Sequence, residues 1–353
     1  MNRKDEHVSL AKAFHKQRST DFDHVHVIHR SFPQVATEEI SIASKLAKLS
    51  LTSPFFINAM TGGSEKTKQL NEQLAILARE TSLAMATGSV SIALKDPSVQ
   101  ESFTIVRKTN PNGIIFANVG AGSTLDQAQR AVDLLEANAL QIHVNAPQEL
   151  VMPEGDRDFR YWLEDIAKIV DTLSVPVIVK EVGFGMTRET IQQLINCGVT
   201  CVDVSGQGGT SFTQIENARR KKREYGYLDN YGVSTVQSLL EANEVPYPYE
   251  YIASGGIRNA YDIFKALCLG ASAVGLSGTI LNHLLVKGVD ETVALIQQWQ
   301  AELTTLYAMT GSKTTLHTRA VPLFFTGPVR DWCDARRIAL DSYSFRKSFY
   351  DTH

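Results

Sequence analysis

The sequence predicts an α/β protein that forms a single (β/α)8 TIM barrel, preceded by an N-terminal extension over residues 1–50. From residue 54 onward, eight short apolar segments alternate with longer segments whose apolar residues have helical spacing. The apolar segments are nearly continuous, which is typical of parallel strands buried on both faces. Eight such units over roughly 250 residues fit a closed barrel, so we predict one domain over residues 1–353.

An open, doubly wound sheet is the alternative arrangement of the same units. That fold usually carries a G-x-G-x-x-G turn, which opens a helix directly after the first strand. No such turn follows residues 54–59, and this favours the closed barrel.

The N-terminal extension is polar and rich in His, Lys and Ser. Leu10–Phe14 is predicted to form a short helix. Thr20–His29 mixes Asp, His and aromatic residues, so we expect a loop or an irregular lead-in there. Ile40–Leu51 is predicted to form a small hairpin that caps another part of the fold.

The first four units follow in order along the chain. Their strands are predicted at residues 54–59, 83–89, 113–121 and 139–145. Their helices are predicted at 65–81, 99–108, 125–137 and 159–173. The first helix is indicated by Leu70, Leu74 and Leu77 on one face, and the third by the alignment of Ala128 and Val132.

The last four units repeat the pattern, with one interruption. Their strands are predicted at residues 175–183, 199–206, 251–257 and 271–278, and their helices at 187–197, 234–243, 261–269 and 280–306. Thr187 is a typical N-cap, with Glu189 in the first turn of its helix. Residues 206–232 form a polar insertion that is a candidate lid.

Composition excludes several classes of protein. Hydrophobic residues make up 43% and charged residues 21% of the 353, and the net charge of −3 favours neither nucleic acid nor an anionic membrane. The four cysteines form no CxxC pair, which argues against zinc and against a disulfide framework. With no signal peptide and no run of 18 apolar residues, we predict a cytoplasmic protein.

The insertion contains one run of like charge, RRKKR at residues 219–223. Such a run permits a nucleic-acid-binding interpretation. A solvated face is the more common outcome, and a lid that orders over a bound anion is a third interpretation.

The segment LQIHVNAPQE, residues 140–149, is the main candidate for a site. His143 and Asn145 alternate with apolar residues, so both side chains are expected on one face of the strand. Gln148 and Glu149 come just past the strand end, where Pro147 stiffens the turn. In a parallel α/β protein, sites form at that end of the strands. The alternative is a buried strand with satisfied polar groups and a solvated Glu149.

Three glycine-rich turns follow the last three strands: SGQGGTSF (205–212), SGGIR (254–258) and LSGTI (276–280). Free backbone N–H groups at a helix start bind phosphate, and barrels often place a phosphate site at these loops. The pattern predicts a phosphate-bearing cofactor. Arg258 is expected either to add a bidentate contact or to pair with a carboxylate.

Lys180 lies within the otherwise apolar strand VPVIVKEV. A lysine that points into a barrel needs an anionic partner. We favour an anionic cofactor ring as that partner, and a structural pair with an acid such as Asp203 is the alternative.

Seven motifs together resemble the flavin-dependent, type 2 isopentenyl diphosphate isomerases, and RKDEH (3–7) resembles the opening of that family. The motifs are AMTGG (59–63), ANVGAG (117–122), QIHVNAPQE (141–149), MPEGDRDF (152–159), VIVKEVGFG (177–185), DVSGQGGTSF (203–212) and SGGIRNAYD (254–262). The resemblance covers nearly the whole chain, in the same order. Two of these features are not general among flavin barrels: the Gln-Glu pair that follows H-x-N, and the GQGGTSF turn.

The resemblance implies an isomerase of isoprenoid biosynthesis that interconverts isopentenyl and dimethylallyl diphosphate by a 1,3-allylic proton shift. It implies FMN as cofactor, Mg2+, and NADPH as reductant, with reduced FMN acting as acid and base and no net redox change. It also implies a homo-oligomer, a tetramer or an octamer, without nucleic acid or membrane partners.

Residue roles are carried over by motif. The resemblance places FMN against Ala59, Met60, Thr61, Ser89, Asn118, Lys180, Ser205, Thr210, Gly255, Gly256, Arg258, Ser277 and Gly278. It places the substrate against Arg3, Lys4, His143, Asn145 and Gln148, so the extension is expected to contribute to the substrate site. Lys180, Gln148, His143 and Asn145 are the implied catalytic residues, and Glu149 is the implied Mg2+ ligand.

The chain departs from the family pattern at two places. It has NAPQE (145–149) where N-P-L-Q-E is common, and GSVS (88–91) where G-S-Q-R is common. The basic phosphate contact expected near Ser91 is therefore missing, and another cation must serve.

Two other flavin or nucleotide barrels are disfavoured. A 2-hydroxy acid oxidase needs a catalytic His near the seventh strand, where this chain has Ser254 and Gly255. A nucleotide dehydrogenase needs a nucleophilic Cys in the loop after strand six, but Cys201 lies inside that strand.

Overall fold

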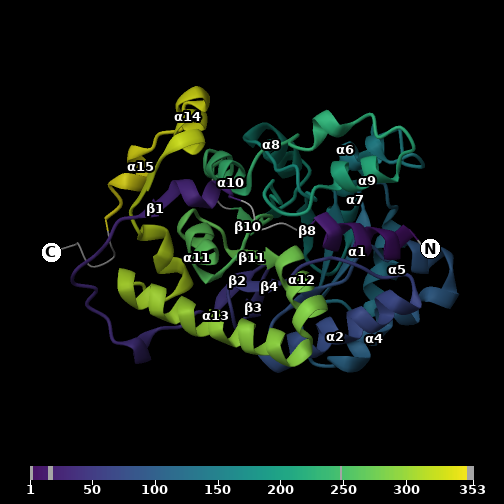
Figure 1. The fold of residues 1–353 in the computed structure, drawn as a ribbon, viewed down its shortest axis with the longest axis horizontal. Coiled ribbons are helices and arrows are strands. Elements are labelled where there is room, and N and C mark those ends of the chain that lie inside the picture. Colours follow the sequence, from purple (N-terminus) through teal and green to yellow (C-terminus); the bar gives the residue numbers. More distant parts are fainter. Residues whose placement is uncertain (1–2, 15–18, 247–248, 348–353) are drawn as a thin grey trace.

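The computed structural model describes residues 3–14, 19–246 and 249–347. Within these residues, eight parallel strands close into a barrel in the order β10-β11-β4-β5-β6-β7-β8-β9, and helices surround it (Figure 1). The strands are β4 (Phe55–Ile57), β5 (Met85–Ala86), β6 (Ile115–Gly120), β7 (Ala139–His143), β8 (Val177–Lys180), β9 (Cys201–Asp203), β10 (Glu250–Ser254) and β11 (Ala273–Leu276). The predicted fold is confirmed, and the open sheet is excluded.

The helices of the barrel units follow the predicted pattern. They are α2 (Glu65–Thr81), α4 (Glu101–Thr109), α5 (Leu125–Leu135), α7 (Trp162–Thr172), α8 (Arg188–Asn196), α10 (Thr235–Asn243), α11 (Ala260–Cys268) and α12 (Gly278–Lys287). Short helices α3 (Ser91–Lys95) and α6 (Ala146–Val151) lie in the loops after β5 and β7. The core consists of the apolar helix faces packed against the outer side of the strands.

A hairpin closes the amino-terminal end of the barrel. Its strands β2 (Ser44–Leu46) and β3 (Leu49–Leu51) pair antiparallel, as predicted. Leu46 is fully buried against inward-facing strand residues such as Phe56 and Phe116. The Ala47 amide donates a hydrogen bond to the carboxylate of Glu250, the first residue of β10. The hairpin therefore fills this end of the barrel.

The prediction for Thr20–His29 is wrong. A 3-10 turn, η1 (Asp21–His24), leads into β1 (Val25–Val27), which pairs antiparallel with β12 (Leu323–Phe325). The partner strand lies about 300 residues further along the chain, so local sequence could not reveal the pairing. Helices α14 (Gly327–Arg336) and α15 (Asp341–Ser344) continue from β12 at the side of the molecule opposite α1 (Figure 1).

Two predicted helices differ substantially from their observed extent, and the insertion differs from the prediction as well. Helix α1 covers Arg3–Phe14, not only its last turn. The single helix predicted at 280–306 is divided at Gly288, whose φ of 84° ends α12 before α13 (Val289–Thr310) begins. The polar insertion contains a helix that was not predicted, α9 (Phe212–Arg219), and a 3-10 turn, η4 (Gly226–Leu228). Four residues of α9 are buried.

Candidate active site

A cavity of about 810 Å³ opens at the carboxyl ends of the barrel strands. Its size is typical of a cofactor or small-molecule site. Each predicted site residue with a described side chain lines it: Ala59, Met60, Thr61, Ser89, Asn118, His143, Asn145, Gln148, Glu149, Lys180, Ser205, Thr210, Gly255, Gly256, Arg258, Ser277 and Gly278. Arg3 and Lys4 begin α1, but their side chains lie outside the described part of the chain.

A polar network crosses the barrel at the base of the cavity. Asn58 donates to Asp203 at 2.8 Å and accepts from Gln141 at 2.9 Å. These residues are on β9, β7 and the end of β4, which are not neighbours in the sheet, so the bonds span the interior. Asn118 donates to Gln141 at 3.2 Å, and its oxygen lies 2.8 Å from Nδ1 of His143. The network fixes the His143 ring at the cavity wall.

Gln141 was missed by the sequence analysis, and Asn58 was expected only as one of the polar residues at a strand end. A signal for them exists, because each is the polar residue two positions after an inward-facing apolar residue, Phe56 or Ala139. Period-2 spacing places such a residue inside the barrel, one layer nearer the cavity.

Lys180 and Asp203 lie side by side on β8 and β9 at the same level. Burial lowers the pKa of Lys180, opposed by the negative charges of Asp203 and Glu181. Burial likewise raises the pKa of Asp203, opposed by Lys180 and by donors that include Ser254 at 2.6 Å. Lys180 Nζ donates to the Glu181 carbonyl at 2.6 Å, and the described contacts include no ion pair with Asp203. The ammonium thus retains donors for a ligand in the cavity.

The glycine-rich turns after β9 and β10 pack directly against each other. A Cβ on Gly255, whose φ is +94°, would lie 2.0 Å from the Gly206 carbonyl oxygen. A Cβ on Gly208 would lie 3.0 Å from the Cα of Gly256. Only glycine permits these turns to meet and leave their backbones at the cavity wall.

Arg258 makes the carboxylate pairs that the sequence analysis left as an alternative. Its guanidinium contacts Asp23 of η1 at 2.6 Å and Asp262 of α11 at 2.8 Å, and its backbone N–H also donates to Asp262. Both partners raise the pKa of Arg258, and the Arg258 hydrogen bond lowers that of Asp23 to about 2. Arg258 therefore ties the turn after β10 to the N-terminal extension.

Helix α6 carries Gln148 and Glu149, for which the sequence analysis expected only a turn. Pro147 occupies the first turn of this helix, where a missing N–H is harmless. Asn145 donates to Gln148 Oε1 at 3.2 Å and to Glu149 Oε1 at 2.9 Å. Gln148 Nε2 donates to Glu216 of α9 at 2.9 Å, so both ends of the Gln148 amide are fixed.

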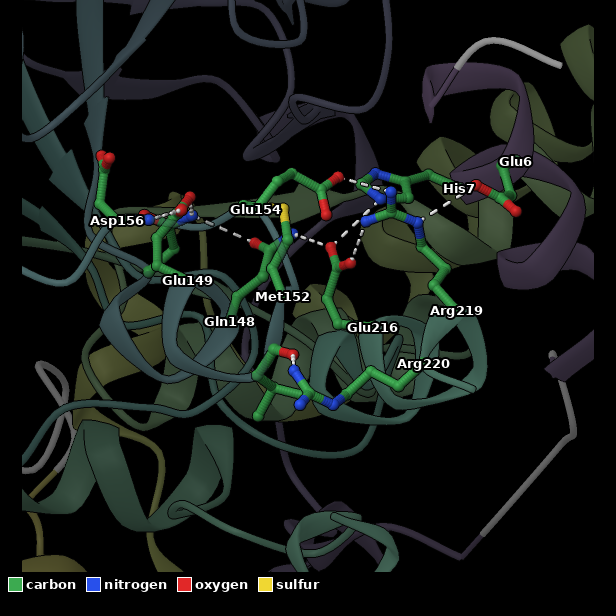
Figure 2. A network of polar contacts seen from close by, with 12 residues as sticks. Glu6, His7, Gln148, Glu149, Met152, Glu154, Asp156, Glu216, Arg219 and Arg220 are labelled. Carbon is green, nitrogen blue, oxygen red and sulfur yellow. Dashed lines mark hydrogen bonds and ion pairs between the residues drawn. The ribbon is translucent and has the colours of Figure 1, made fainter. Parts of the chain in front are cut away.

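Glu216 and Arg219 join α9 to α1 and α6 (Figure 2). Glu216 is fully buried and contacts His7 Nε2 at 3.1 Å and Arg219 at 2.6 Å. Arg219 also pairs with Glu6 at 3.1 Å and Glu154 at 2.5 Å. Burial raises the pKa of Glu216, but His7, Gln148 and Arg219 outweigh it and hold the pKa at about 2.

No local pattern in the sequence predicts the roles of Glu216 and His7, because their partners lie on other elements. The RRKKR run is also not one solvated face. Arg219 is engaged as described, and Arg220 pairs with Glu224 at 2.5 Å, while residues 221–223 are exposed.

The cavity fits FMN on its own geometry. Thr61 Oγ1 is buried in the wall with no hydrogen-bond partner among the described residues, as expected of a ligand contact. Helix α12 begins at Ser277 on the wall, and no side chain of the described residues caps it. Its free N–H groups and the glycine turns suit a phosphate, and Lys180 suits an anionic ring.

A divalent cation fits this cavity only if the protein and the substrate phosphates hold it together. No group of three or more His, Cys, Asp or Glu suitable for a metal occurs in the described part of the chain. Glu149 lines the cavity, and both its oxygens accept hydrogen bonds, from Asn145 and from the Asp156 amide. Mg2+ is commonly held by one or two carboxylates together with substrate phosphates.

Solved structures with the same fold are flavoenzymes. A mandelate oxidase variant with benzaldehyde superposes with a TM-score of 0.65 at 18% identity, covering 91% of this chain and 90% of that one. A flavocytochrome b2 variant with benzoylformate gives a TM-score of 0.62 at 17% identity, covering 86% and 76%. At this identity the likeness shows the fold alone.

No helix of the described residues is long and apolar enough to cross a membrane.

Sequence comparison shows the family. Residues 115–320 match the FMN-dependent dehydrogenase family. Isopentenyl-diphosphate delta-isomerase of Latilactobacillus sakei is 50% identical over 340 residues, 96% of this chain and 97% of that protein. The enzymes of that name from Staphylococcus haemolyticus and Staphylococcus aureus are 48% and 47% identical, over 95% of this chain and 96% of each protein. The chain therefore belongs to the isopentenyl-diphosphate delta-isomerases within the FMN-dependent dehydrogenase family.

Proposed function

We propose that this enzyme interconverts isopentenyl and dimethylallyl diphosphate by a 1,3-allylic proton shift, with FMN bound in the barrel cavity, in isoprenoid biosynthesis. The observation that carries the proposal is the convergence of seventeen residues, implied by the family resemblance, on the wall of one cavity. The full-length similarity to enzymes of that name supports it.

FMN would be held by Ala59, Met60, Thr61, Ser89, Asn118, Lys180, Ser205, Thr210, Gly255, Gly256, Arg258, Ser277 and Gly278. When bound and reduced, it would supply an electron-rich ring that stabilises positive charge on the substrate and exchanges a proton with it. The Lys180 ammonium would stabilise negative charge on that ring. Arg258 would act through its ion pairs, by holding the turn after β10 in place.

The substrate would lie against Arg3, Lys4, His143, Asn145 and Gln148. The fixed amide of Gln148 would orient the reacting carbons, since Asn145 and Glu216 hold both of its ends. His143, oriented by Asn118, would donate a hydrogen bond to the charged end of the substrate. Glu149 would hold Mg2+ against the diphosphate.

Four further features belong to the same proposal. NADPH would reduce the cofactor, the enzyme would be a tetramer or octamer, and the cytoplasm would be its compartment. The four cysteines are free thiols in the described structure, as a reducing compartment requires. Residues 206–232 would act as a lid with the N-terminal extension, because Arg219 already links the two.

The test is a spectrum and an assay on one sample. FMN is added to purified protein, and absorbance is recorded before and after anaerobic reduction by NADPH. Isopentenyl diphosphate and Mg2+ are then added, and dimethylallyl diphosphate is followed. Product in the reduced sample only is expected. Flavin binding without product would reject the isomerase, and absence of flavin binding would reject the cofactor as well.

A further inference from the structure

The cavity wall includes several groups that carry or acquire positive charge, and most of them are engaged. Lys180 is buried and donates to the Glu181 carbonyl. Arg258 is paired with two aspartates, and His7 contacts Glu216. Lys95 also lines the cavity and is exposed, and its side chain makes no hydrogen bond or ion pair with any residue that the structure describes.

Lys95 is the last residue of the short helix α3. Three residues of this helix, Ser91, Ile92 and Lys95, line the cavity. Ala93 of the same helix is fully buried. The Val90 amide, just before α3, donates to the Asn118 carbonyl at 2.9 Å, which ties this helix to the strand that orients His143.

Three acids also line the cavity: Glu149, Glu154 and Asp156. Glu154 pairs with Arg219, which leaves the charges of Glu149 and Asp156 without an ion-pair partner among the described residues. A diphosphate that binds beside these two carboxylates requires a compensating cation. A lysine with an exposed ammonium binds phosphate as a point charge, and its flexible stem needs no fixed geometry.

We propose that Lys95 binds the diphosphate of the substrate and replaces the basic contact that Ser91 does not provide. The inference rests on the proposed function, because that function supplies the diphosphate. It is independent of the FMN contacts.

The test compares three variants with wild-type holoenzyme. Lys95→Met is expected to raise both the KM for isopentenyl diphosphate and the Kd for Mg2+–inorganic diphosphate by about tenfold, as for one charged hydrogen bond at an exposed site. The kcat and the Kd for FMN are expected to change less than about threefold. Lys95→Arg is expected to retain most of the affinity. Lys45→Met, an exposed lysine in the hairpin at the opposite end of the barrel, is the control and is expected to match wild type.

A relocated charge gives a sharper test. In the Lys95→Met background, Ser91→Arg places a cation one helical turn away on the same cavity wall. Recovery of KM and of diphosphate affinity is expected, which a purely structural role of Lys95 would not produce.

Two results would overturn the proposal: unchanged KM and diphosphate affinity in Lys95→Met, or a parallel loss of FMN affinity. The proposed function fails separately, if wild type yields no dimethylallyl diphosphate. Calorimetry with inorganic diphosphate would still test Lys95 in that case.

Discussion

Lys180 is the residue at which burial and function conflict most directly. The residue is only 6% exposed and burial lowers its pKa, yet no ion pair among the described contacts neutralises its charge. A protein retains such a group where a ligand supplies the missing charge.

We expect Lys180→Met to reduce kcat/KM by at least about 100-fold, because a charge that stabilises the reacting ring is lost. The free energy of unfolding should fall by less than about 2 kcal/mol, since the cost of burying the ammonium is removed as well. Steady-state kinetics and urea unfolding measure the two effects. Turnover equal to wild type would remove Lys180 from the site.

Glu181 beside it gives a pH-dependent stability. Burial raises its pKa from 4.5 to about 7, against three backbone N–H donors from residues 182–184. The unfolded carboxyl ionises first, so this group makes the folded state lose stability as pH rises from about 4.5 to 7. In Glu181→Gln that component should vanish. Urea unfolding at several pH values checks this, and parallel curves for wild type and variant would contradict it.

At the scale of elements, α9 is the junction between the N-terminal helix and the site. The Glu216 carboxylate contacts Gln148 of α6, His7 of α1 and Arg219 of its own helix (Figure 2). Removing one partner of a buried ion pair leaves the others uncompensated.

Glu216→Gln should therefore lower the free energy of unfolding by about 3 kcal/mol at pH 7 and reduce kcat, because Gln148 loses its fixed orientation. The folded-state pKa of Glu216 lies below its ordinary value of 4.5, at about 2. The difference in free energy of unfolding between wild type and Glu216→Gln should thus be complete above pH 4.5 and disappear as pH falls toward 2.

A matched control for Glu216→Gln is Glu224→Gln. Glu224 pairs with Arg220 at the end of the same segment but does not line the cavity. The acid unfolding curve and the steady-state kinetic constants of this variant should be close to those of wild type. A difference between Glu216→Gln and wild type that persists unchanged at pH 2 would contradict the assignment.

At the scale of the whole molecule, the barrel separates stability from chemistry along its axis. The amino-terminal end is filled by the β2–β3 hairpin and apolar strand residues, and the carboxyl end holds the polar network and the cavity. Leu46→Ala should therefore lower the free energy of unfolding by about 2 to 5 kcal/mol. The Kd for FMN, measured by flavin fluorescence below the unfolding transition, should not change, and a weakened FMN affinity would contradict this separation.

Similarity in overall fold and similarity in sequence lead to different groups of proteins. Oxidases share the barrel at 15–18% identity, whereas the isomerases share 46–50% of residues over nearly the whole chain. At the site, this chain has Ser254 at the end of the seventh barrel strand, where the sequence analysis expected a 2-hydroxy acid oxidase to need a histidine nearby.

The sequence by itself determined the barrel and the wall of the cavity. Both depend on local signals: apolar strands at regular intervals, and small or polar residues just beyond their ends, which parallel topology brings to one mouth. His143 and the glycine turns were predicted for this reason, and Asn118 was implied by the family resemblance.

Only the tertiary structure decided the contacts between distant segments. The β1–β12 pair, the Arg258–Asp23 ion pair and the junction of His7, Glu216 and Gln148 join residues between 68 and about 300 positions apart. No periodicity encodes such pairs, because each is selected by burial of charge and by free backbone donors that only the assembled barrel creates. Whether a lysine at the mouth is paired or available for a ligand was decided in the same way.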